Sequence, residues 1–317
     1  MTSGTRHSPH DGRLLAGTEI SALAAQVRLK VLACGDGLPE LGELRAVWST
    51  TNTRFLRFAC LQGDDVVVKL PLSGDSTVVS RELRSLQTLH GLMSGSDVAV
   101  PLPVGRLHVP AALLTAWIPG SDLDRQLRLS GSTERVSQHV AACGRALAHF
   151  HGHSAAWVTA NADSVLSAED FAPNNVRVSD AGQLWWLDPP TSNRYVQRED
   201  DVSHFLTLMC RMMFRDHGSD RKAGRRADVS PSITAELVAQ FLAAYQRRAA
   251  VSIDEERLRS SVKVRLRKLA RKDFRRGHPV RAFRTGVYLT GIRFGTGTVA
   301  RAHDPQRALD WASETEL

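Results

Sequence analysis

The stretch FAPNNVRVSDAGQLWWLDPP, residues 171–190, decides the fold class of this chain. Asp170 stands directly before it, two short alternating runs flank a turn at SDAG, and Asp188 follows the second run. Alternation of apolar and polar residues around such a turn predicts a β-hairpin. The hairpin would bring Asp188 back beside Asn175, so that two carboxylates and an amide gather in one place.

The spacing of these polar residues matches what phosphoryl transfer from ATP requires. Asp170 and Asn175 fit D-x-x-x-x-N, the pattern of a kinase catalytic loop. Asn175 and Asp188 supply the oxygen ligands that Mg²⁺ prefers, which leaves Asp170 to orient an acceptor hydroxyl and take its proton. Because D-x-x-x-x-N is common by chance, this hypothesis needs support from the rest of the chain.

Residues upstream of the hairpin add a cation and a further carboxylate. Lys69 ends the apolar run VVVK, which predicts a strand, and Glu82 lies in a segment with helical spacing. An unpaired ammonium group on an apolar strand would be costly, which favours a partner for Lys69. A strand lysine paired with a helix glutamate is how kinases hold the α- and β-phosphates of the nucleotide.

The order of the predicted elements indicates two lobes. Strand-like segments around one inserted helix predict an N-terminal nucleotide-binding lobe at residues 15–118. Amphipathic helices interrupted by the hairpin predict a C-terminal catalytic and substrate lobe at residues 119–250. Residues 1–14 read as a disordered tail, and residues 251–317 form a basic C-terminal extension.

The chain resembles the protein-kinase-like phosphotransferases of the aminoglycoside phosphotransferase and choline kinase type over residues 40–250. STTNTRFLRF is similar to the family's nucleotide loop, LLTAWIPGSDL to its hinge, and CGRALAHFHG to the helix ahead of its catalytic loop. The chain also has the family's order of site residues, which are Lys69, Glu82, Asp170, Asn175 and Asp188.

The resemblance implies a fold and a set of residue roles. The fold class is α+β: a bilobal protein-kinase-like fold with a small antiparallel-sheet N-lobe containing one helix and a larger helical C-lobe. Asp170 would be catalytic, and Asn175 and Asp188 would hold the metal. The nucleotide would be bound by Lys69, Glu82, Ser49, Asn52 and the backbone groups of Ala116 and Ile118.

The activity that the resemblance implies is an ATP- and Mg²⁺-dependent phosphotransferase. It would transfer the γ-phosphate to a hydroxyl of a small molecule, namely a sugar, a glycolipid headgroup or an amino alcohol. Two features depart from the family pattern: Ala168 replaces the usual loop histidine, and Pro189-Pro190 follows the metal aspartate. The alternative is a catalytically degraded, kinase-like scaffold that binds a nucleotide and docks to a membrane or partners through the basic extension.

The basicity of the chain belongs to one segment. The net charge is +8, and residues 255–284 hold twelve Lys and Arg against three acidic residues. Leu258, Val262, Leu266 and Leu269 lie on one face of a predicted helix there. Three alternatives remain open: a packed helix with a solvated basic face, a membrane-surface helix that contacts anionic lipids, and a site for an anionic substrate or nucleic acid. Nucleic-acid binding rests on charge alone and is not expected.

The remaining features indicate a cytoplasmic protein, with a membrane-peripheral location as an extension of that prediction. The chain has no apolar run of membrane-spanning length, and its four cysteines lack C-x-x-C spacing. We expect the cluster of His149, His151 and His153 to be solvated at a helix end instead of binding metal. Asp200 or Asp201 is expected to be the N-cap of the next helix. The sequence leaves the acceptor and the oligomeric state open.

Overall fold

The computed structural model describes most of the chain between residues 17 and 275. The described ranges are 17–34, 37–61, 63–130, 134–155, 164–188, 190, 194–213 and 231–275. Several predictions fall on residues outside these ranges: the disordered tail at residues 1–14, Pro189 of the double proline, and the part of the basic extension after residue 275.

The chain divides into two compact units. Unit 1 comprises residues 1–91 and 100–119, and unit 2 comprises residues 92–99 and 120–317. The short segment at residues 92–99 therefore joins unit 2, although unit 1 flanks it on both sides in the sequence. Its strand β4 (Val98–Ala99) pairs in parallel with a strand of unit 2, which explains this assignment.

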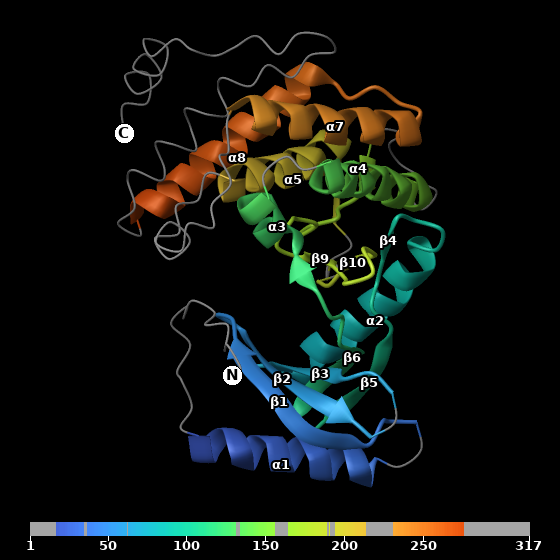
Figure 1. Cartoon of the computed structure of the whole chain (residues 1–317), viewed down its shortest axis with the longest axis vertical. Coiled ribbons are helices and arrows are strands. Elements are labelled where there is room, and N and C mark those ends of the chain that lie inside the picture. Colours follow the sequence, from blue (N-terminus) through green and yellow to red (C-terminus); the bar gives the residue numbers. More distant parts are fainter. Residues whose placement is uncertain are drawn as a thin grey trace. The chain divides into compact units, whose positions relative to one another are not determined.

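Unit 1 is built on a five-stranded antiparallel sheet (Figure 1). The strand order is β1-β2-β3-β6-β5, so the last two strands along the chain enter the sheet in reversed order. The five strands are β1 (Leu41–Ser49), β2 (Thr53–Cys60), β3 (Val66–Pro71), β5 (Pro103–His108) and β6 (Ala111–Ala116).

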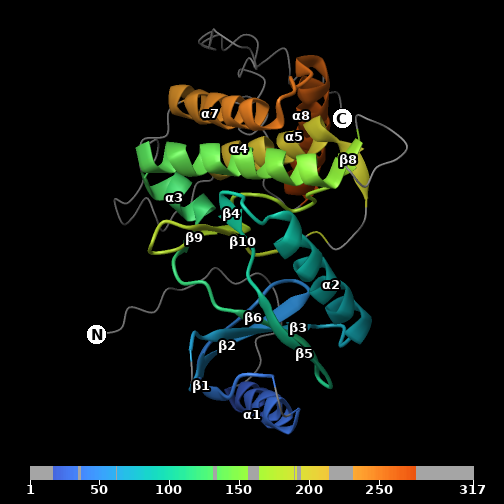
Figure 2. The same cartoon turned by 90° about the vertical axis from the view of Figure 1, so that its right-hand side faces the viewer.

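A different helix lies on each side of this sheet, α1 (Gly17–Ala33) on one side and α2 (Ser76–Leu92) on the other. Val66, Val68 and Leu70 of β3 belong to one buried apolar cluster with residues of α1. Side chains alternate along a strand, so Lys69 is directed to the opposite face. Figure 2 shows α2 running on that opposite side of the sheet from α1. The period-two pattern of VVVK thus directs the lysine toward α2.

Unit 2 consists mainly of helices. They are α3 (Leu123–Ser130), α4 (Glu134–Ala155), α5 (Arg198–Met213), α7 (Pro231–Ala249) and α8 (Glu255–Arg275). A four-stranded sheet has the order β4-β10-β9-β7, with β7 (Ser121–Asp122), β9 (Val176–Val178) and β10 (Leu184–Trp186). A separate pair, which sequence reasoning missed, joins β8 (Ser164–Leu166) to β11 (Tyr195–Gln197). The predicted α+β fold class is confirmed.

Close packing of α4 on α7 forms the centre of unit 2. A Cβ added at Gly144 of α4 would lie 2.5 Å from the carbonyl oxygen of Phe241 in α7. The glycine of the CGRALAHFHG segment therefore lets the two helix backbones approach each other. Beneath them, Trp186 of β10 is fully buried, and its ring contacts the rings of Phe150 and Phe171 edge-on. The tryptophan is a core residue and is not exposed for ligand binding.

The predicted hairpin is present as β9 and β10. Trp186 pairs with Val176 and Leu184 pairs with Val178 in an antiparallel register. At the turn, Ser179 N–H donates to the carbonyl of Gln183 at 2.8 Å, and Gly182 adopts a φ of +85° that favours glycine. The N–H of Leu187 then donates to the carbonyl of Asn175 at 2.9 Å. The ladder therefore continues to the residue that precedes Asp188.

Helix α8 has a buried apolar face and an exposed basic face. Leu258, Val262 and Leu266 are buried, and α8 packs on α5. The exposed side of the helix bears the cations Arg257, Arg259, Lys263, Arg267, Lys268, Arg271 and Lys272. This arrangement agrees with a packed helix that has a solvated basic face. Among the described residues, no helix is long and apolar enough to cross a membrane.

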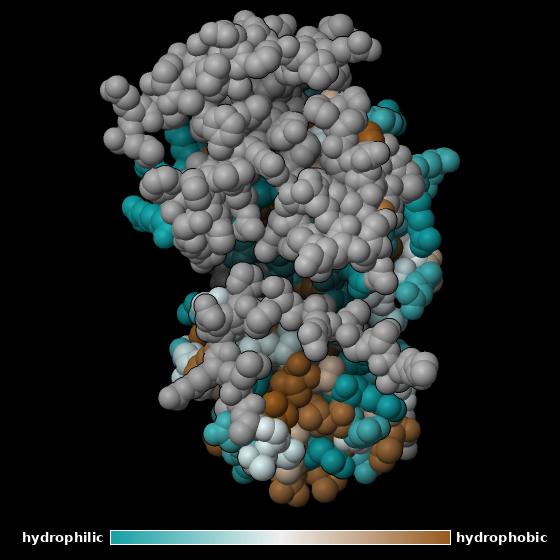
Figure 3. Space-filling view, turned by 60° about the vertical axis from the view of Figure 1, so that its left-hand side comes forward, coloured by the Kyte–Doolittle hydropathy of each residue, from teal (hydrophilic) through white to brown (hydrophobic). Residues whose placement is uncertain are grey.

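Most of the large apolar side chains that are exposed in the described part of the chain belong to unit 1. Figure 3 shows hydrophobic residues next to one another on the surface of unit 1. Leu29 and Leu32 of α1 are 66% and 68% exposed, because the helix turns Val27 and Val31 toward the sheet instead.

Candidate active site

The loop between β8 and β9 carries the predicted catalytic residue. Asp170 lies in this loop, and its side chain is 74% exposed. The side-chain amide of Asn175 donates to the backbone carbonyl of Asp170 at 2.9 Å, which closes the loop on itself. The Oδ1 atom of Asn175 accepts a bond from the Asn174 amide at 2.8 Å. Sequence spacing selected Asn175, and the structure places both asparagines at the end of the loop.

The electrostatics of the loop are dominated by carboxylates. Partial desolvation raises the pKa of the Asp170 carboxyl above its ordinary value, and the negative charges of Asp188 and Glu169 raise it further. Asp188 is therefore close enough to Asp170 for their charges to interact. The hairpin brings together the three oxygen-bearing residues that the sequence predicted to share one place. A cation bound among them would relieve the repulsion.

Backbone strain occurs directly before the predicted catalytic residue. Glu169 adopts a φ of +43°, a left-handed conformation that non-glycine residues rarely take. Its N–H donates to the Ser167 hydroxyl at 3.1 Å, and the Phe171 N–H donates to the Ala168 carbonyl at 3.0 Å. These bonds hold a tight turn that presents Asp170 to solvent while Phe171 is buried in the core.

A buried carboxylate, Asp201, holds this turn from below. Its Oδ2 accepts the Ala168 N–H at 2.6 Å, and its Oδ1 accepts the Ser167 hydroxyl at 3.1 Å. Sequence reasoning expected Asp200 or Asp201 to be an N-cap, and this was wrong because α5 already begins at Arg198. Ala168 stands where the family usually has a histidine, and here its backbone N–H bonds the loop to Asp201 of α5.

The bracing continues into α4 and α7 through His151. Its Nε2 lies 3.2 Å from Asp201 Oδ2, and its Nδ1 lies 2.7 Å from the hydroxyl of Tyr245. Since a tyrosine hydroxyl can donate to Nδ1, Nε2–H can donate to Asp201. The expectation that the histidine cluster is solvated was wrong for His149 and His151, which are 6% and 1% exposed. Burial by α7, which comes about 90 residues later in the chain, could not be read from HFHGH.

Unit 1 contains the predicted pair of lysine and glutamate. Lys69 Nζ on β3 lies 2.7 Å from Glu82 Oε1 on α2, and their side chains are 12% and 16% exposed. At this depth the two charges gain from each other more than an exposed pair would. The alternation in VVVK and the helical spacing around Glu82 are the features that place these groups together.

The other residues predicted to bind nucleotide are spread along the same sheet. Ser49 ends β1 opposite Arg54, and the carbonyl of Asn52 accepts the Leu72 N–H at 2.8 Å. Ala116 ends β6 opposite Val66, and Ile118, two residues later, is buried. These residues lie in unit 1, whereas Asp170, Asn175 and Asp188 lie in unit 2.

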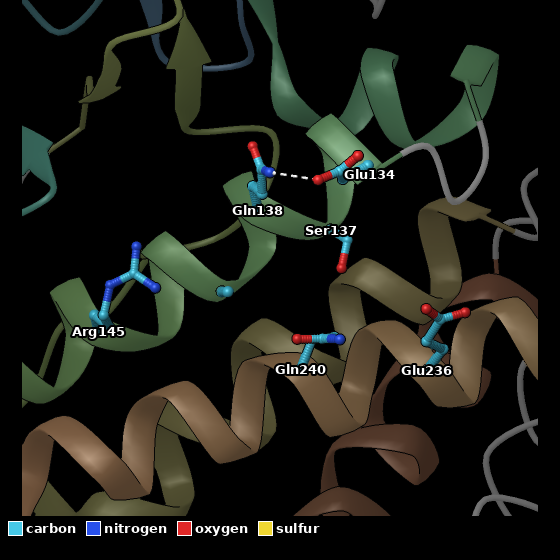
Figure 4. Close-up of a pocket in the computed structure, with 7 residues that line it drawn as sticks. Glu134, Ser137, Gln138, Arg145, Glu236 and Gln240 are labelled. Atoms are coloured by element: carbon cyan, nitrogen blue, oxygen red, sulfur yellow. Dashed lines mark hydrogen bonds between the residues drawn. The ribbon is translucent and has the colours of Figure 1, made fainter.

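Unit 2 also has a polar hollow on its surface that includes none of the predicted site residues. Figure 4 shows this hollow between α4 and α7, lined by Glu134, Ser137, Gln138, Ala141, Arg145, Glu236 and Gln240. The amide of Gln138 donates to Glu134 at 3.2 Å. Within the described part of the chain, no group of three or more His, Cys, Asp or Glu side chains is arranged to hold a metal ion. The candidate metal site depends instead on a mixed pair, Asn175 and Asp188.

A family model identifies the family to which the chain belongs. The model described as APH, phosphotransferase enzyme family, matches residues 45–280, which include every residue of both groups. The chain therefore belongs to this family and is a phosphotransferase that acts on small-molecule hydroxyl groups. The resemblance drawn from the motifs is confirmed. A comparison with curated protein sequences finds no match.

Solved structures share the fold at low sequence identity. Macrolide 2'-phosphotransferase MphH from Brachybacterium faecium is 16% identical, with 84% of this chain and 99% of that chain covered and a TM-score of 0.50. Amicoumacin kinase hAmiN, solved in complex with AMP-PNP, Ca²⁺ and Ami, is 11% identical, with 94% and 95% covered and a TM-score of 0.51. The protein-kinase-like fold predicted from the sequence is thus confirmed.

Proposed function

We propose that this member of the phosphotransferase enzyme family transfers the γ-phosphate of ATP to a hydroxyl group of a small molecule, with Asp170 as the catalytic residue. The observation that carries the proposal is the environment of Asp170. Its carboxylate is exposed, has a raised pKa and stands on a strained turn whose backbone is bonded to Asp201. A raised pKa suits a group that accepts a proton in the reaction.

Asp170 would act by orienting the acceptor. Its carboxylate oxygen would accept a hydrogen bond from the acceptor hydroxyl and so align the oxygen lone pair with the γ-phosphorus. As the new O–P bond forms, the hydroxyl proton passes to Asp170, and the electrons of the breaking bond remain on the ADP oxygen. The strained turn fixes the backbone from which the carboxylate projects, which reduces the freedom lost during the reaction.

Lys69 and Glu82 would hold the phosphates of the nucleotide. The ammonium group of Lys69 is already positioned by Glu82 at 2.7 Å, so a phosphate oxygen would meet a cation whose orientation is fixed. In this proposal Ser49 and Asn52 lie along the phosphates, and the backbone of Ala116 and Ile118 bonds the adenine. The buried Ile118 and the apolar residues of β6 suit the flat apolar face of a base.

Asn175 and Asp188 would hold Mg²⁺. They offer one amide oxygen and one carboxylate, both of which are hard oxygen ligands, and the charge interaction of Asp188 with Asp170 favours a cation here. When bound, the metal would neutralise the negative charge of the phosphates. The relative solved with AMP-PNP has Ca²⁺ in its complex, another cation that takes oxygen ligands.

The acceptor would be a sugar, a glycolipid headgroup or an amino alcohol. The relatives named above act, by their names, on a macrolide and on amicoumacin, so these antibiotics join the list of compounds to be screened. A cytoplasmic location and contact of the basic face of α8 with an anionic membrane surface stay predictions. A glycolipid acceptor would require the enzyme to approach such a surface.

The proposal is tested by an acceptor screen together with a binding assay. We expect ATP to raise the melting temperature when Mg²⁺ is present, and this rise to shrink in Asp188→Asn. We expect at least one acceptor of the screen to release ADP and gain one phosphate, as read by mass spectrometry. A Mg²⁺-dependent shift without transfer to any acceptor would favour the nucleotide-binding scaffold, and no shift at millimolar ATP would contradict both.

A further inference from the structure

An inward-facing arginine distinguishes one turn of the basic helix α8 from the others. Arg265 is half-buried, and all three of its guanidinium nitrogens bond to α5. Nε donates to the Ser203 hydroxyl at 2.9 Å, Nη2 to the Asp200 carbonyl at 2.8 Å, and Nη1 to Nδ1 of His204 at 2.9 Å. Its neighbour Arg267 is exposed. The cation at position 265 therefore has a specific role in the fold.

The bond from Arg265 determines the state of His204. A guanidinium group has only donors, so Nδ1 of His204 must accept and cannot carry a proton. Burial, followed by the positive charge of Arg265, lowers the pKa of His204 to about 4, while Asp201 opposes this shift. The ring is consequently neutral at pH 7, and its one proton resides on Nε2.

The protonated nitrogen of His204 lies near the predicted catalytic carboxylate. Nε2 lies 3.9 Å from Oδ1 of Asp170. Nε2 is buried, and it has no hydrogen-bond partner among the described residues. A buried N–H without a partner is costly, so a group within reach gains by moving to meet it. The distance exceeds that of a hydrogen bond, but catalytic bonds of this kind often tighten only when substrate is bound.

We propose that Arg265 fixes His204 as an Nε2–H donor and that His204 positions the carboxylate of Asp170 for catalysis. This inference rests on the proposed function of Asp170. One carboxylate oxygen would be held by His204, which leaves the other oxygen directed to the acceptor hydroxyl. His204 is thus a positioning residue that acts through Asp170. The charged groups that face it are Arg265 from α8, Asp201 from its own helix and Asp170 from the loop.

The geometry also explains why part of the basic segment is joined to the catalytic unit. Ser261, one turn before Arg265, donates to the carboxylate of Asp200 at 2.8 Å. The side chains of Leu258, Val262 and Leu266 are buried on this face of α8. The helix therefore has an apolar seam that fixes its position and, within that seam, a cation that reaches the ring beside the catalytic loop.

Replacing the histidine tests the proposed role in turnover. We expect His204→Leu to lower kcat by up to about 10²-fold, since misplacement of a catalytic group by about 1 Å has an effect of this size. The KM for ATP should stay unchanged. His204→Gln should recover most of the activity, because its amide nitrogen takes the place of Nε2, whereas the shorter Asn should not. His139→Leu is the matched control: His139 is also buried in unit 2, and its kcat should equal that of wild type.

Nuclear magnetic resonance tests the same inference without any turnover. We expect the ring nitrogens of His204 to show a single neutral Nε2–H tautomer at pH 7, retained in Arg267→Met and lost in Arg265→Met. The carboxyl carbon resonance of Asp170, assigned with Asp170→Asn, should shift in His204→Leu and stay in place in His139→Leu.

Each outcome bears on one of the two proposals. An Nδ1–H tautomer, an unmoved Asp170 resonance in His204→Leu, or a His204→Leu enzyme with the kcat of wild type would overturn the inference. If the wild-type enzyme transfers phosphate to no acceptor, the proposed function fails, and the inference is then decided by the resonances alone. Melting temperatures of all variants distinguish a loss of position from a loss of folding.

Discussion

Asp170 and Asp201 both lie in unit 2, and Asp201 bonds to the loop that carries Asp170. The surroundings of the two carboxylates are opposite. Asp201 is 4% exposed, and its oxygens face donors from Ser167, Ala168 and His151. Asp170 is 74% exposed and lies near two further negative charges. A carboxylate whose oxygens are bonded to several buried donors stabilises a fold, whereas an exposed carboxylate remains available to a substrate. Substitutions at the two aspartates and in their surroundings test this division of roles.

The largest expected effect follows from removing the buried member of the comparison. Asp201→Leu leaves the Ala168 N–H, the Ser167 hydroxyl and His151 without their acceptor, so the free energy of unfolding should fall by about 3–5 kcal/mol. Urea unfolding followed by circular dichroism measures this. Asp201→Asn keeps one oxygen and should lose less. A loss below 1 kcal/mol for the leucine variant would show that Asp201 does not hold the loop.

Replacing Lys69 in unit 1 tests whether a group that is already ion-paired can also take part in phosphate transfer. Lys69 is bonded to Glu82, yet we expect Lys69→Met to lower kcat/KM for ATP by about 10²-fold, as loss of one charge-stabilising donor does in other enzymes. Arg84→Met removes an exposed cation from the same helix as Glu82 and is the control. Equal kinetics in the two variants would remove Lys69 from the proposed site.

A substitution in the contact between α4 and α7, away from both aspartates, distinguishes an effect on stability from an effect on catalysis. Gly144→Ala forces a Cβ toward the carbonyl oxygen of Phe241, which should lower the free energy of unfolding by about 1–3 kcal/mol. Because the substitution leaves Asp170 and its neighbours unchanged, kcat at 15 °C should equal that of wild type. A parallel fall in kcat and stability would indicate that any loosening of unit 2 disturbs the loop.

The smallest expected effect is a gain in thermal stability when the exposed carboxylate, Asp170, is replaced. The folded state raises the pKa of Asp170, so its ionised form is disfavoured by folding, and this cost is present at neutral pH. The cost disappears as the pH falls below the ordinary pKa of an aspartate. Asp170→Asn should therefore melt slightly above wild type at pH 7 and together with it near pH 3, by calorimetry. A variant that melts lower at pH 7 would contradict the sign.

Local patterns in the sequence predicted the groups whose partners are set by one strand, turn or helix. The alternation of VVVK directed Lys69 to one face of its sheet, and the SDAG turn returned Asp188 to Asn175. The same patterns could not predict Asp201, His151 or His204, whose partners are 33 to 94 residues away in the chain. Those contacts depend on how α4, α5 and α8 pack, which periodicity does not specify.

The histidine cluster shows the limit most clearly. HFHGH at the end of a helix has the polarity of a solvated surface, yet His151 is buried because Tyr245 of α7 and Asp201 of α5 supply its two hydrogen bonds. The basic segment shows the converse. Its pattern correctly gave the apolar face of α8, but Arg265 looked like every other cation in the segment until its contacts with α5 were known.

The central claim is that Asp170 acts on the acceptor and does not bind the nucleotide. The most direct test measures Mg²⁺-ATP binding by calorimetry and phosphate transfer by mass spectrometry on the same preparation of Asp170→Asn, using an acceptor of the wild-type enzyme. We predict binding within a few-fold of wild type and a fall in transfer of about 10²–10⁴-fold, as for loss of a general base. Transfer within tenfold of wild type would contradict the account.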